Sequence, residues 1–347
     1  MTLKDVPHSR PWISESDQAY VNENLRTGLI ASGELVAEFE NKISALSGSK
    51  HVFAQATGTL ALTVGLKSLG LVERMDVLLP TYVCSNVIEA VIAAGQNPVL
   101  VDVNEFGVID PIQALKKMTP NTGAVIAAHI FGATCNIESL RNLGVPIIED
   151  ACQAVGLETS GLKAGAQGDI GIYSFHATKM LTTAQGGALL TDDNSTADSV
   201  RRQLSTYSPT FTFPYPNMTD LQAALGLAQI SRLPAFIKRR DHIALIYDQV
   251  LSGSSILRAP LPFPDTRFRY VVESQVPFGA VDLHFKSKRI TVKRGVDELL
   301  HRTQGLNDSD FPNSVDLYNS NVSLPFYPGL SDSEVERVAD AIGEFHG

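Results

Sequence analysis

The chain has 347 residues, of which 44% are hydrophobic and 19% are charged, and its formal net charge is −9. A chain of this length exceeds one ordinary hydrophobic core, so we expect a large domain and a smaller one, and the composition excludes a disordered protein. The negative charge argues against nucleic acid as a partner, because a protein that binds nucleic acid presents a basic face.

Three cysteines, Cys84, Cys135 and Cys152, are scattered through the sequence. Their odd number and their spacing indicate neither a disulfide framework nor a metal site, and they favour a reducing compartment. The opening MTLKDVPHSRPW contains no apolar leader segment, and no later stretch is long and apolar enough to span a bilayer. We therefore expect a soluble, cytoplasmic protein without a membrane partner.

Short apolar runs alternate with helical patterns in the first two thirds of the chain. Because most of these runs are apolar on both faces, they predict an α/β fold with a mostly parallel central sheet sandwiched by helices. The predicted helices include 59–70 and 86–95, and Asn86 and Glu89 have the spacing of a capping box. The predicted strands are 76–80, 97–103, 123–132, 145–150, 168–175 and 187–193.

The pattern changes at Thr219, where two helices are predicted with a break near Pro234. The sequence beyond them predicts a smaller C-terminal α/β domain. We place the boundary at residue 235, which gives a large domain, 1–235, with an N-terminal arm, and a small domain, 236–347.

Asp150 is the first candidate for a functional side chain. Ligands of an open parallel sheet bind beyond the carboxyl ends of its strands, and Asp150 directly follows the apolar run VPIIE. A carboxylate at such a depth needs a cationic partner, or it takes up a proton. A role as N-cap of a following helix explains the residue equally well. Glu149 should point to the opposite face of the strand.

Lys179 and the pair Gly58 and Thr59 are further candidates. Lys179 lies in a polar turn between two predicted strands, and a partly desolvated amine there is a competent nucleophile towards aldehydes. An ordinary surface lysine is the alternative. Gly58 and Thr59 precede a predicted helix, whose first N–H groups and dipole favour a phosphate. An ordinary N-cap gives the same pattern.

Together, these three places match the ring nitrogen, the aldehyde and the phosphate of pyridoxal 5′-phosphate (PLP). The combination therefore predicts a PLP site. Tyr82 also follows a strand, and its ring is a candidate to stack on the pyridine ring of the cofactor, with packing in the core as the alternative.

The sequence resembles the DegT/DnrJ/EryC1/StrS family of PLP-dependent sugar aminotransferases, which have the fold of aspartate aminotransferase (PLP-dependent transferase fold type I). The similar segments follow one another in the order of the family and extend over nearly the whole chain. They are 32–62, 78–103, 147–156, 168–187, 218–233 and 323–342.

The resemblance implies roles for individual residues around the cofactor ring. Lys179 would form the Schiff base and would move the proton during amino transfer. Asp150 would pair with the pyridinium nitrogen and keep it protonated. Gln153 would lie near the phenolic oxygen of the ring, and Tyr82 would occupy the stacking position.

The resemblance also implies a phosphate site. The hydroxyls of Thr59 and Ser174 and the backbone N–H groups of Gly58 and Leu60 would hold the phosphate. For Ser174, a hydroxyl that bonds to its own turn is the alternative. His176 would be near the substrate, although a packed, hydrogen-bonded histidine fits the same position.

The chain departs from the family at two places. The glutamate that precedes the glycine pair after the lysine is Gln185 here. The usual Asn-Tyr-Arg-Met stretch, whose asparagine reaches the phosphate of the neighbouring subunit, is replaced, so Tyr215 or Asn217 would have to provide that contact. The replacing residues are Tyr215, Pro216, Asn217 and Met218.

The implied activity is transfer of an amino group from an amino acid, usually glutamate, to a nucleotide-linked keto-sugar. It would proceed in two ping-pong half-reactions in a homodimer with active sites at its interface. The basic runs 237–242 and 286–294 could bind a diphosphate, or they could be ordinary solvated faces. A non-catalytic PLP-binding sensor or assembly subunit is the alternative, and the retained Lys179 and Asp150 argue against it.

Overall fold

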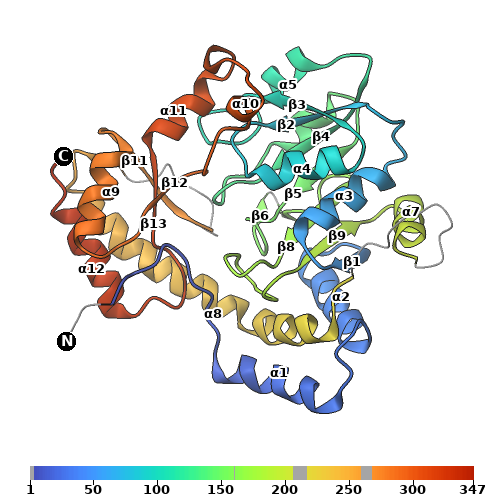
Figure 1. Ribbon diagram of the computed structural model, residues 1–347, viewed down its shortest axis with the longest axis horizontal. Helices are drawn as coiled ribbons and strands as arrows, with labels where there is room; N and C mark the ends of the chain where they lie inside the picture. Colours follow the sequence, from blue (N-terminus) through green and yellow to red (C-terminus); the bar gives the residue numbers. More distant parts are fainter. Residues whose placement is uncertain (1–3, 160, 206–216, 259–267) are drawn as a thin grey trace.

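The computed structural model describes residues 4–159, 161–205, 217–258 and 268–347. A large sheet and a small sheet form its framework, and the long helix α8 (Asp220–Leu251) runs from one to the other (Figure 1). Within these ranges, no helix combines the length and the apolar character needed to cross a membrane.

The large sheet has seven strands in the spatial order β1-β9-β8-β5-β4-β2-β3. The strands from β8 to β3 run parallel, whereas β9 is antiparallel to both of its neighbours. The predicted mostly parallel sheet and its six predicted strands are therefore confirmed, and β1 is an additional strand at the edge. The strands are β1 (His51–Gln55), β2 (Asp76–Pro80), β3 (Asn97–Val101), β4 (Thr122–Ala128), β5 (Ile147–Asp150), β8 (Ile170–Ser174) and β9 (Gly187–Thr191).

Helices cover both faces of this sheet. On one face, α3 (Gly58–Ser68) and α4 (Ser85–Ala93) bury side chains such as Leu66 in one core cluster with Ile148 of β5. On the other face, Phe39 of α2 (Glu34–Ser47) meets Phe175 edge to face. The remaining elements of this part are α1 (Glu15–Thr27), α5 (Pro111–Lys117), α6 (Ile137–Arg141), α7 (Asn194–Leu204) and the hairpin of β6 (Glu158–Thr159) and β7 (Leu162–Lys163).

The structure corrects the predicted start of α4. The N-cap residue is Cys84, no side chain caps this end, and Asn86 and Glu89 form no capping box. The motif is misleading here because Asn86 already lies inside the first turn, where its side chain cannot take the N-cap position.

The predicted break near Pro234 is also wrong, because α8 continues through this residue without interruption. Before the proline, Leu233 packs in the core of the large sheet, and after it Ile243 and Tyr247 pack in the core of the small sheet. We infer that burial on both sides outweighs the hydrogen bond that proline removes. The predicted domain boundary at residue 235 falls inside this helix and stays a prediction.

The small sheet is antiparallel, in the order β10-β11-β13-β12, and the N-terminal segment joins it through a bridge between Val6 and Ile290. Its elements confirm the predicted smaller α/β unit. They are β10 (Leu257–Arg258), β11 (Tyr270–Ser274), α9 (Phe278–Ser287), β12 (Lys293–Arg294), α10 (Leu300–Thr303), a 3₁₀ turn (Asp308–Asp310), α11 (Pro312–Ser320), β13 (Asn321–Leu324) and α12 (Asp332–Gly343).

Candidate active site

A cavity of about 500 Å³ lies beyond the carboxyl ends of β4, β5 and β8, where an open parallel sheet binds its ligands. The first residues of α3 and α4 line it from the large sheet. Arg269, Lys293 and Asp297 line it from the small sheet. Most of the predicted site residues contribute to its wall, namely Gly58, Thr59, Asp150, Gln153, Ser174, His176 and Lys179.

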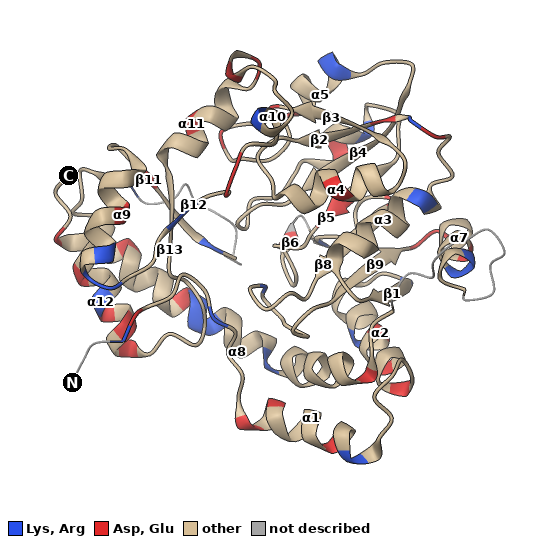
Figure 2. Ribbon diagram, in the orientation of Figure 1, with Lys and Arg blue, Asp and Glu red and all other residues tan. Residues whose placement is uncertain are grey.

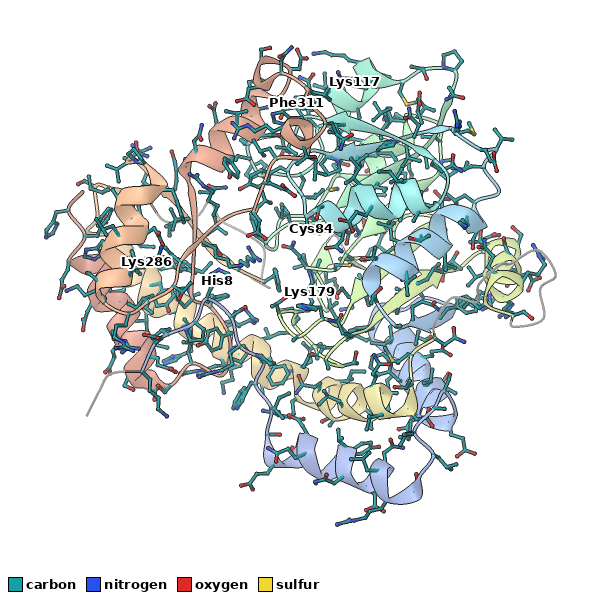
Figure 3. All side chains as sticks on the ribbon, viewed as in Figure 1. His8, Cys84, Lys117, Lys179, Lys286 and Phe311 are labelled. Atoms are coloured by element: carbon teal, nitrogen blue, oxygen red, sulfur yellow. The ribbon has the colours of Figure 1, made fainter. Side chains whose placement is uncertain are left out.

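Lys179 lies in the turn after β8 and is half-buried. Its backbone N–H donates to the carbonyl oxygen of His176 (2.9 Å), which closes the turn. Its Nζ lies over the ring of Phe268, 5.3 Å from the ring centroid. Figure 3 shows Lys179 near the centre of the molecule, between the large and the small sheet. Among the described residues, no carboxylate forms an ion pair with this amine, so the amine is available to a ligand in the cavity.

Asp150 ends β5 and faces the same cavity. Its Oδ1 accepts a hydrogen bond from the Cys152 N–H (3.1 Å), and turns rather than a helix follow, so the explanation as a helix N-cap is wrong. Burial raises the pKa of the Cys152 thiol, Asp150 raises it further, and Lys179 lowers it. The charges of Asp150, at the end of β5, and of Lys179, in the turn after β8, therefore both influence the pKa of this thiol.

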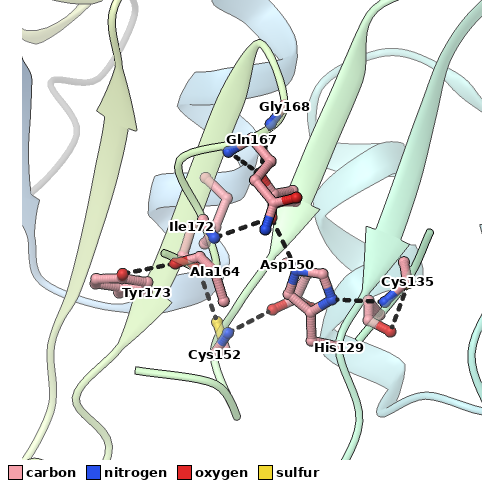
Figure 4. A network of polar contacts seen from close by, with 12 residues as sticks. His129, Cys135, Asp150, Cys152, Ala164, Gln167, Gly168, Ile172 and Tyr173 are labelled. Carbon is pink, nitrogen blue, oxygen red and sulfur yellow. Dashed lines mark hydrogen bonds and ion pairs between the residues drawn. The ribbon is translucent and has the colours of Figure 1, made fainter. Parts of the chain in front are cut away.

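Glu149 points to the opposite face of β5, as predicted from strand alternation, and is fully buried. Its carboxylate accepts hydrogen bonds from His129 Nε2 (2.8 Å) and from the backbone N–H groups of Gly165, Gln167 and Gly168 (Figure 4). Burial alone would raise the pKa of Glu149, but these hydrogen bonds outweigh it and lower the pKa.

The protonation state of His129 follows from its two hydrogen bonds. Its Nδ1 accepts the backbone N–H of Cys135 (3.0 Å), so this nitrogen carries a lone pair. The proton of the neutral ring is then on Nε2, which donates to Glu149. The negative charge of Glu149 is thus held by four N–H donors directly behind Asp150, and His129 also reaches the wall of the cavity.

The start of α3 forms a narrow cradle. A Cβ atom at Gly58 would lie 3.0 Å from Cβ and 3.3 Å from Oγ of Ser174, so only glycine allows this approach without displacing the serine. Gly187 is paired in register with both Gln55 and Ser174, and a Cβ atom there would lie only 2.5 Å from the backbone of Thr57. The unpaired first N–H groups of the helix and the Ser174 hydroxyl suit a phosphate in donor chemistry and in space.

Two details of the predicted phosphate site change. The N-cap residue is Thr57, whose Oγ1 accepts the N–H of Leu60 (3.1 Å), so this N–H already has a partner and its predicted use for phosphate stays a prediction. Thr57 itself lines the cavity. Ser174 Oγ accepts the N–H of His176 at 3.4 Å, so the serine bonds to its own turn while it lines the cavity.

The structure places Tyr82 in the core, which was the alternative to its predicted stacking role. Its ring is fully buried in a core cluster, edge to face with Phe131, and its hydroxyl accepts a hydrogen bond from Asn321 Nδ2 (3.1 Å). Tyr82 does not line the cavity. Cys84, the residue immediately before α4, lines the cavity wall instead. Cys84 is exposed at the cavity wall, and partial desolvation there raises the pKa of its thiol.

The remaining predicted contacts have defined places. Gln153 Oε1 accepts the N–H of Phe131 (3.0 Å), which holds this side chain at the cavity. His176 Nδ1 lies 3.0 Å from the Thr178 hydroxyl. Burial and then the charge of Lys179 lower the pKa of His176, so it is neutral near pH 7. Tyr215 lies outside the described residues, so its predicted contact stays untested.

Most of the basic runs are engaged elsewhere. Lys286 pairs with Asp282 (2.6 Å) and Arg289 with Asp5 (2.8 Å), on outer surfaces of the small sheet's domain, where both charge signs mix (Figure 2). Of the described residues in the two runs, Lys293 is the one that lines the large cavity. The structure thus favours the solvated-face explanation for most of these charges.

The sequence profile of the DegT/DnrJ/EryC1/StrS aminotransferase family matches residues 11–343. The chain is similar to the spore coat polysaccharide biosynthesis protein SpsC of Bacillus subtilis (strain 168), with 31% identity over 97% of this chain and 96% of SpsC. The resemblance seen in the sequence is therefore confirmed.

Solved structures confirm the predicted fold. Spr1654 of Streptococcus pneumoniae, which is assigned as a sugar aminotransferase, was determined in its PLP form and is 23% identical, with a TM-score of 0.90 over 98% of each chain. DesI, determined in the presence of its TDP-sugar product, is 24% identical, with a TM-score of 0.90 over 99% of this chain and 93% of DesI.

Proposed function

This chain belongs to the DegT/DnrJ/EryC1/StrS aminotransferase family, and on that premise we propose that it transfers an amino group from an amino acid, glutamate first of all, to a nucleotide-linked keto-sugar. One observation carries the proposal. Lys179, in the turn after β8, and Asp150, the last residue of β5, line one cavity, and the described part of the chain has no ion pair between them. A heterocycle with an aldehyde and a ring nitrogen fits between an amine and a carboxylate placed in this way.

PLP is the cofactor that we propose for this cavity. The Gly58 cradle and the Ser174 hydroxyl would hold its phosphate, and a side chain at position 58 would fill that space. When bound, PLP supplies an aldehyde that takes up the amino group and a ring that stabilises negative charge on the carbon that loses its proton.

The protein's own groups would then do three things. Asp150, held from behind by the network around Glu149, would keep a proton on the ring nitrogen. Lys179 Nζ would hold the aldehyde carbon in the resting protein. Once the substrate amine replaces it, Nζ would carry a proton between the amine-bearing carbon of the substrate and the former aldehyde carbon of the cofactor. Gln153 would hold the ring oxygen. Because the keto acid must leave before the keto-sugar enters, the two half-reactions would be ping-pong.

The relatives support a sugar nucleotide as the amino acceptor. SpsC is a polysaccharide biosynthesis protein, and DesI was determined with its TDP-sugar product. The aminotransferase family supplies the reaction class, and the cavity supplies space beyond the cofactor cradle, towards Lys293 and Asp297.

We also propose a cytoplasmic homodimer with active sites at its interface. The three cysteines are free thiols, as a reducing compartment requires. Apolar side chains in and after α1 are exposed, including Leu25 (49%) and Leu29 (71%), and a second copy of the chain would cover them. Light scattering should show a dimer. A fully active monomer would contradict this part of the proposal.

The decisive test uses the purified protein in two steps. Borohydride reduction should fix PLP on the peptide that contains Lys179, and the Lys179→Ala variant should give no such adduct. In a separate, unreduced sample, glutamate should bleach the cofactor absorbance and release 2-oxoglutarate. A panel of nucleotide keto-sugars should restore this absorbance. If PLP binds but neither half-reaction occurs, the protein is a PLP-binding sensor instead.

A further inference from the structure

Arg269 is a cavity residue for which the proposed chemistry has given no role. It precedes β11 and lines the same large cavity as Asp150. Its guanidinium lies between two aromatic rings, 5.7 Å from the centroid of Phe131 and 5.7 Å from that of Phe268. Burial lowers its pKa, but an arginine keeps its proton in a folded protein, so a positive charge is held beside two apolar rings.

Within the described residues, the guanidinium of Arg269 forms one hydrogen bond. Nη1 donates to the carbonyl oxygen of Gly295 (3.0 Å), and a guanidinium has five N–H donors. Among the described residues, no carboxylate lies within ion-pair distance of Arg269. The nearest acidic influence is Asp297, which is 88% exposed and pairs loosely with Lys293 (3.8 Å). A desolvated cation in this state is an anion-binding group.

The surroundings of Arg269 reinforce the positive charge. A second, small cavity adjoins both Arg269 and Lys179, and Arg240 also lines it. Arg240 is buried, its Nε has no hydrogen-bond partner among the described residues, and burial lowers its pKa to about 9. Its Nη1 donates to the backbone oxygens of Phe268 and Phe326. No aspartate or glutamate of the described chain lines this small cavity.

The position of Arg269 relative to Lys179 indicates which anion belongs there. Lys179 Nζ and the Arg269 guanidinium lie over the same Phe268 ring, at 5.3 Å and 5.7 Å from its centroid. The substrate amine must take the place of Lys179, and in an α-amino acid the carboxylate is attached to the carbon that bears this amine. In a sugar nucleotide, by contrast, the sugar ring separates the reacting carbon from the diphosphate.

We propose that Arg269 binds the α-carboxylate of the amino donor and thereby selects α-amino acids over simple amines in the first half-reaction. This inference rests on the proposed function and deepens it. The planar fork of arginine matches a carboxylate with two parallel hydrogen bonds, and the two flanking rings fix its plane. Lysine at this position would keep the charge but lose the fork.

The test compares Arg269→Met and Arg269→Lys with the wild type, in the PLP-loaded protein. The glutamate concentration that half-saturates cofactor bleaching should rise about 10–100-fold in Arg269→Met, as expected for loss of a charge-assisted hydrogen-bonded pair. Arg269→Lys should lie between. Lys286→Met, which removes an exposed charge paired with Asp282, is the matched control and should stay within about twofold.

Calorimetry with glutarate provides a readout that needs no turnover. Glutarate should bind the wild type and should bind Arg269→Met at least about tenfold more weakly. Equal glutarate binding in the two proteins overturns the proposal. So does weaker binding of UDP or dTDP with unchanged glutarate binding, because the cation would then serve the diphosphate.

Failure of the proposed function is a separate result. If the wild type takes up no PLP, the aminotransferase reaction fails, and the glutarate measurement alone decides the role of Arg269. The unfolding midpoint of Arg269→Met, compared with the wild type, shows whether the variant is folded. A misfolded Met variant leaves the decision to Arg269→Lys, whose glutarate binding should still be weakened.

Discussion

Replacing Glu149 with glutamine tests the network behind Asp150. The carboxylate accepts four N–H donors, two on each oxygen: Gln167 and Gly168 on Oε1, and His129 and Gly165 on Oε2. An amide has one oxygen, so either orientation points its NH₂ group at two donors. His129 cannot turn its proton away, because its Nδ1 already accepts from Cys135.

The expected cost follows from this count. A buried donor without an acceptor costs about 1–3 kcal/mol, so Glu149→Gln should lower the free energy of unfolding by about 2–6 kcal/mol. Urea unfolding followed by circular dichroism measures it. Glu158→Gln, in an exposed pair with Lys163, is the control and should cost less than about 1 kcal/mol.

The pH dependence has a definite sign. The folded-state pKa of Glu149 is lowered, so its stabilising effect is present above its unfolded pKa of 4.5 and is lost as the pH falls through the folded-state value. The difference between wild type and Glu149→Gln should therefore shrink in acid. A difference below about 1 kcal/mol at pH 7 would refute the reasoning, because it would mean that Glu149 is protonated in the folded protein.

Three further variants probe other parts of the structure. Burial and then the charges of Arg269 and Lys293 lower the pKa of His8 to about 3, so the wild type should lose stability as the pH falls below 6.5, and His8→Gln should show a smaller loss in thermal melts. Gly58→Ala should weaken PLP binding about tenfold in a titration of the apoprotein, because the added Cβ meets Ser174; unchanged affinity would argue against the cradle. Tyr82→Phe should leave the PLP absorbance unaltered, because the ring lies in the core, and a shifted band would restore its predicted stacking role.

Much of the fold could be predicted from the sequence, because the central strands are buried on both faces. All residues of β4, β8 and β9 are buried, and such strands have apolar runs with clear ends. The same logic identified Asp150, since a carboxylate directly after such a run is conspicuous. Its neighbour Glu149 was assigned correctly to the other face for the same reason.

The errors have a common origin in tertiary contacts. Pro234 breaks an isolated helix, but two cores hold α8 together on both sides of it. Tyr82 and Cys84 both follow β2, and only the start of α4 decides which side chain faces the cavity. The sequence also did not reveal Thr57 as the N-cap that accepts the Leu60 N–H.

Other site residues escaped sequence reasoning because their partners are distant in the chain. His129 follows β4 and meets Glu149 from the next strand, and its position directly after an apolar run was the one signal that could have identified it. Arg269 lies beside the small sheet, and its aromatic neighbour Phe131 lies beside the large one. Such pairs become visible only when the two sheets are placed together in the fold.

The unbroken course of α8 has a mechanical consequence. Each end of α8 packs in a separate hydrophobic core, so the helix resists bending in its middle. A hinge motion that moves one sheet away from the other would first have to unwind turns of this helix. Entry and exit of a bulky sugar nucleotide should therefore depend on movements of the segments at the cavity mouth, while the spacing between the two halves stays constant through the catalytic cycle.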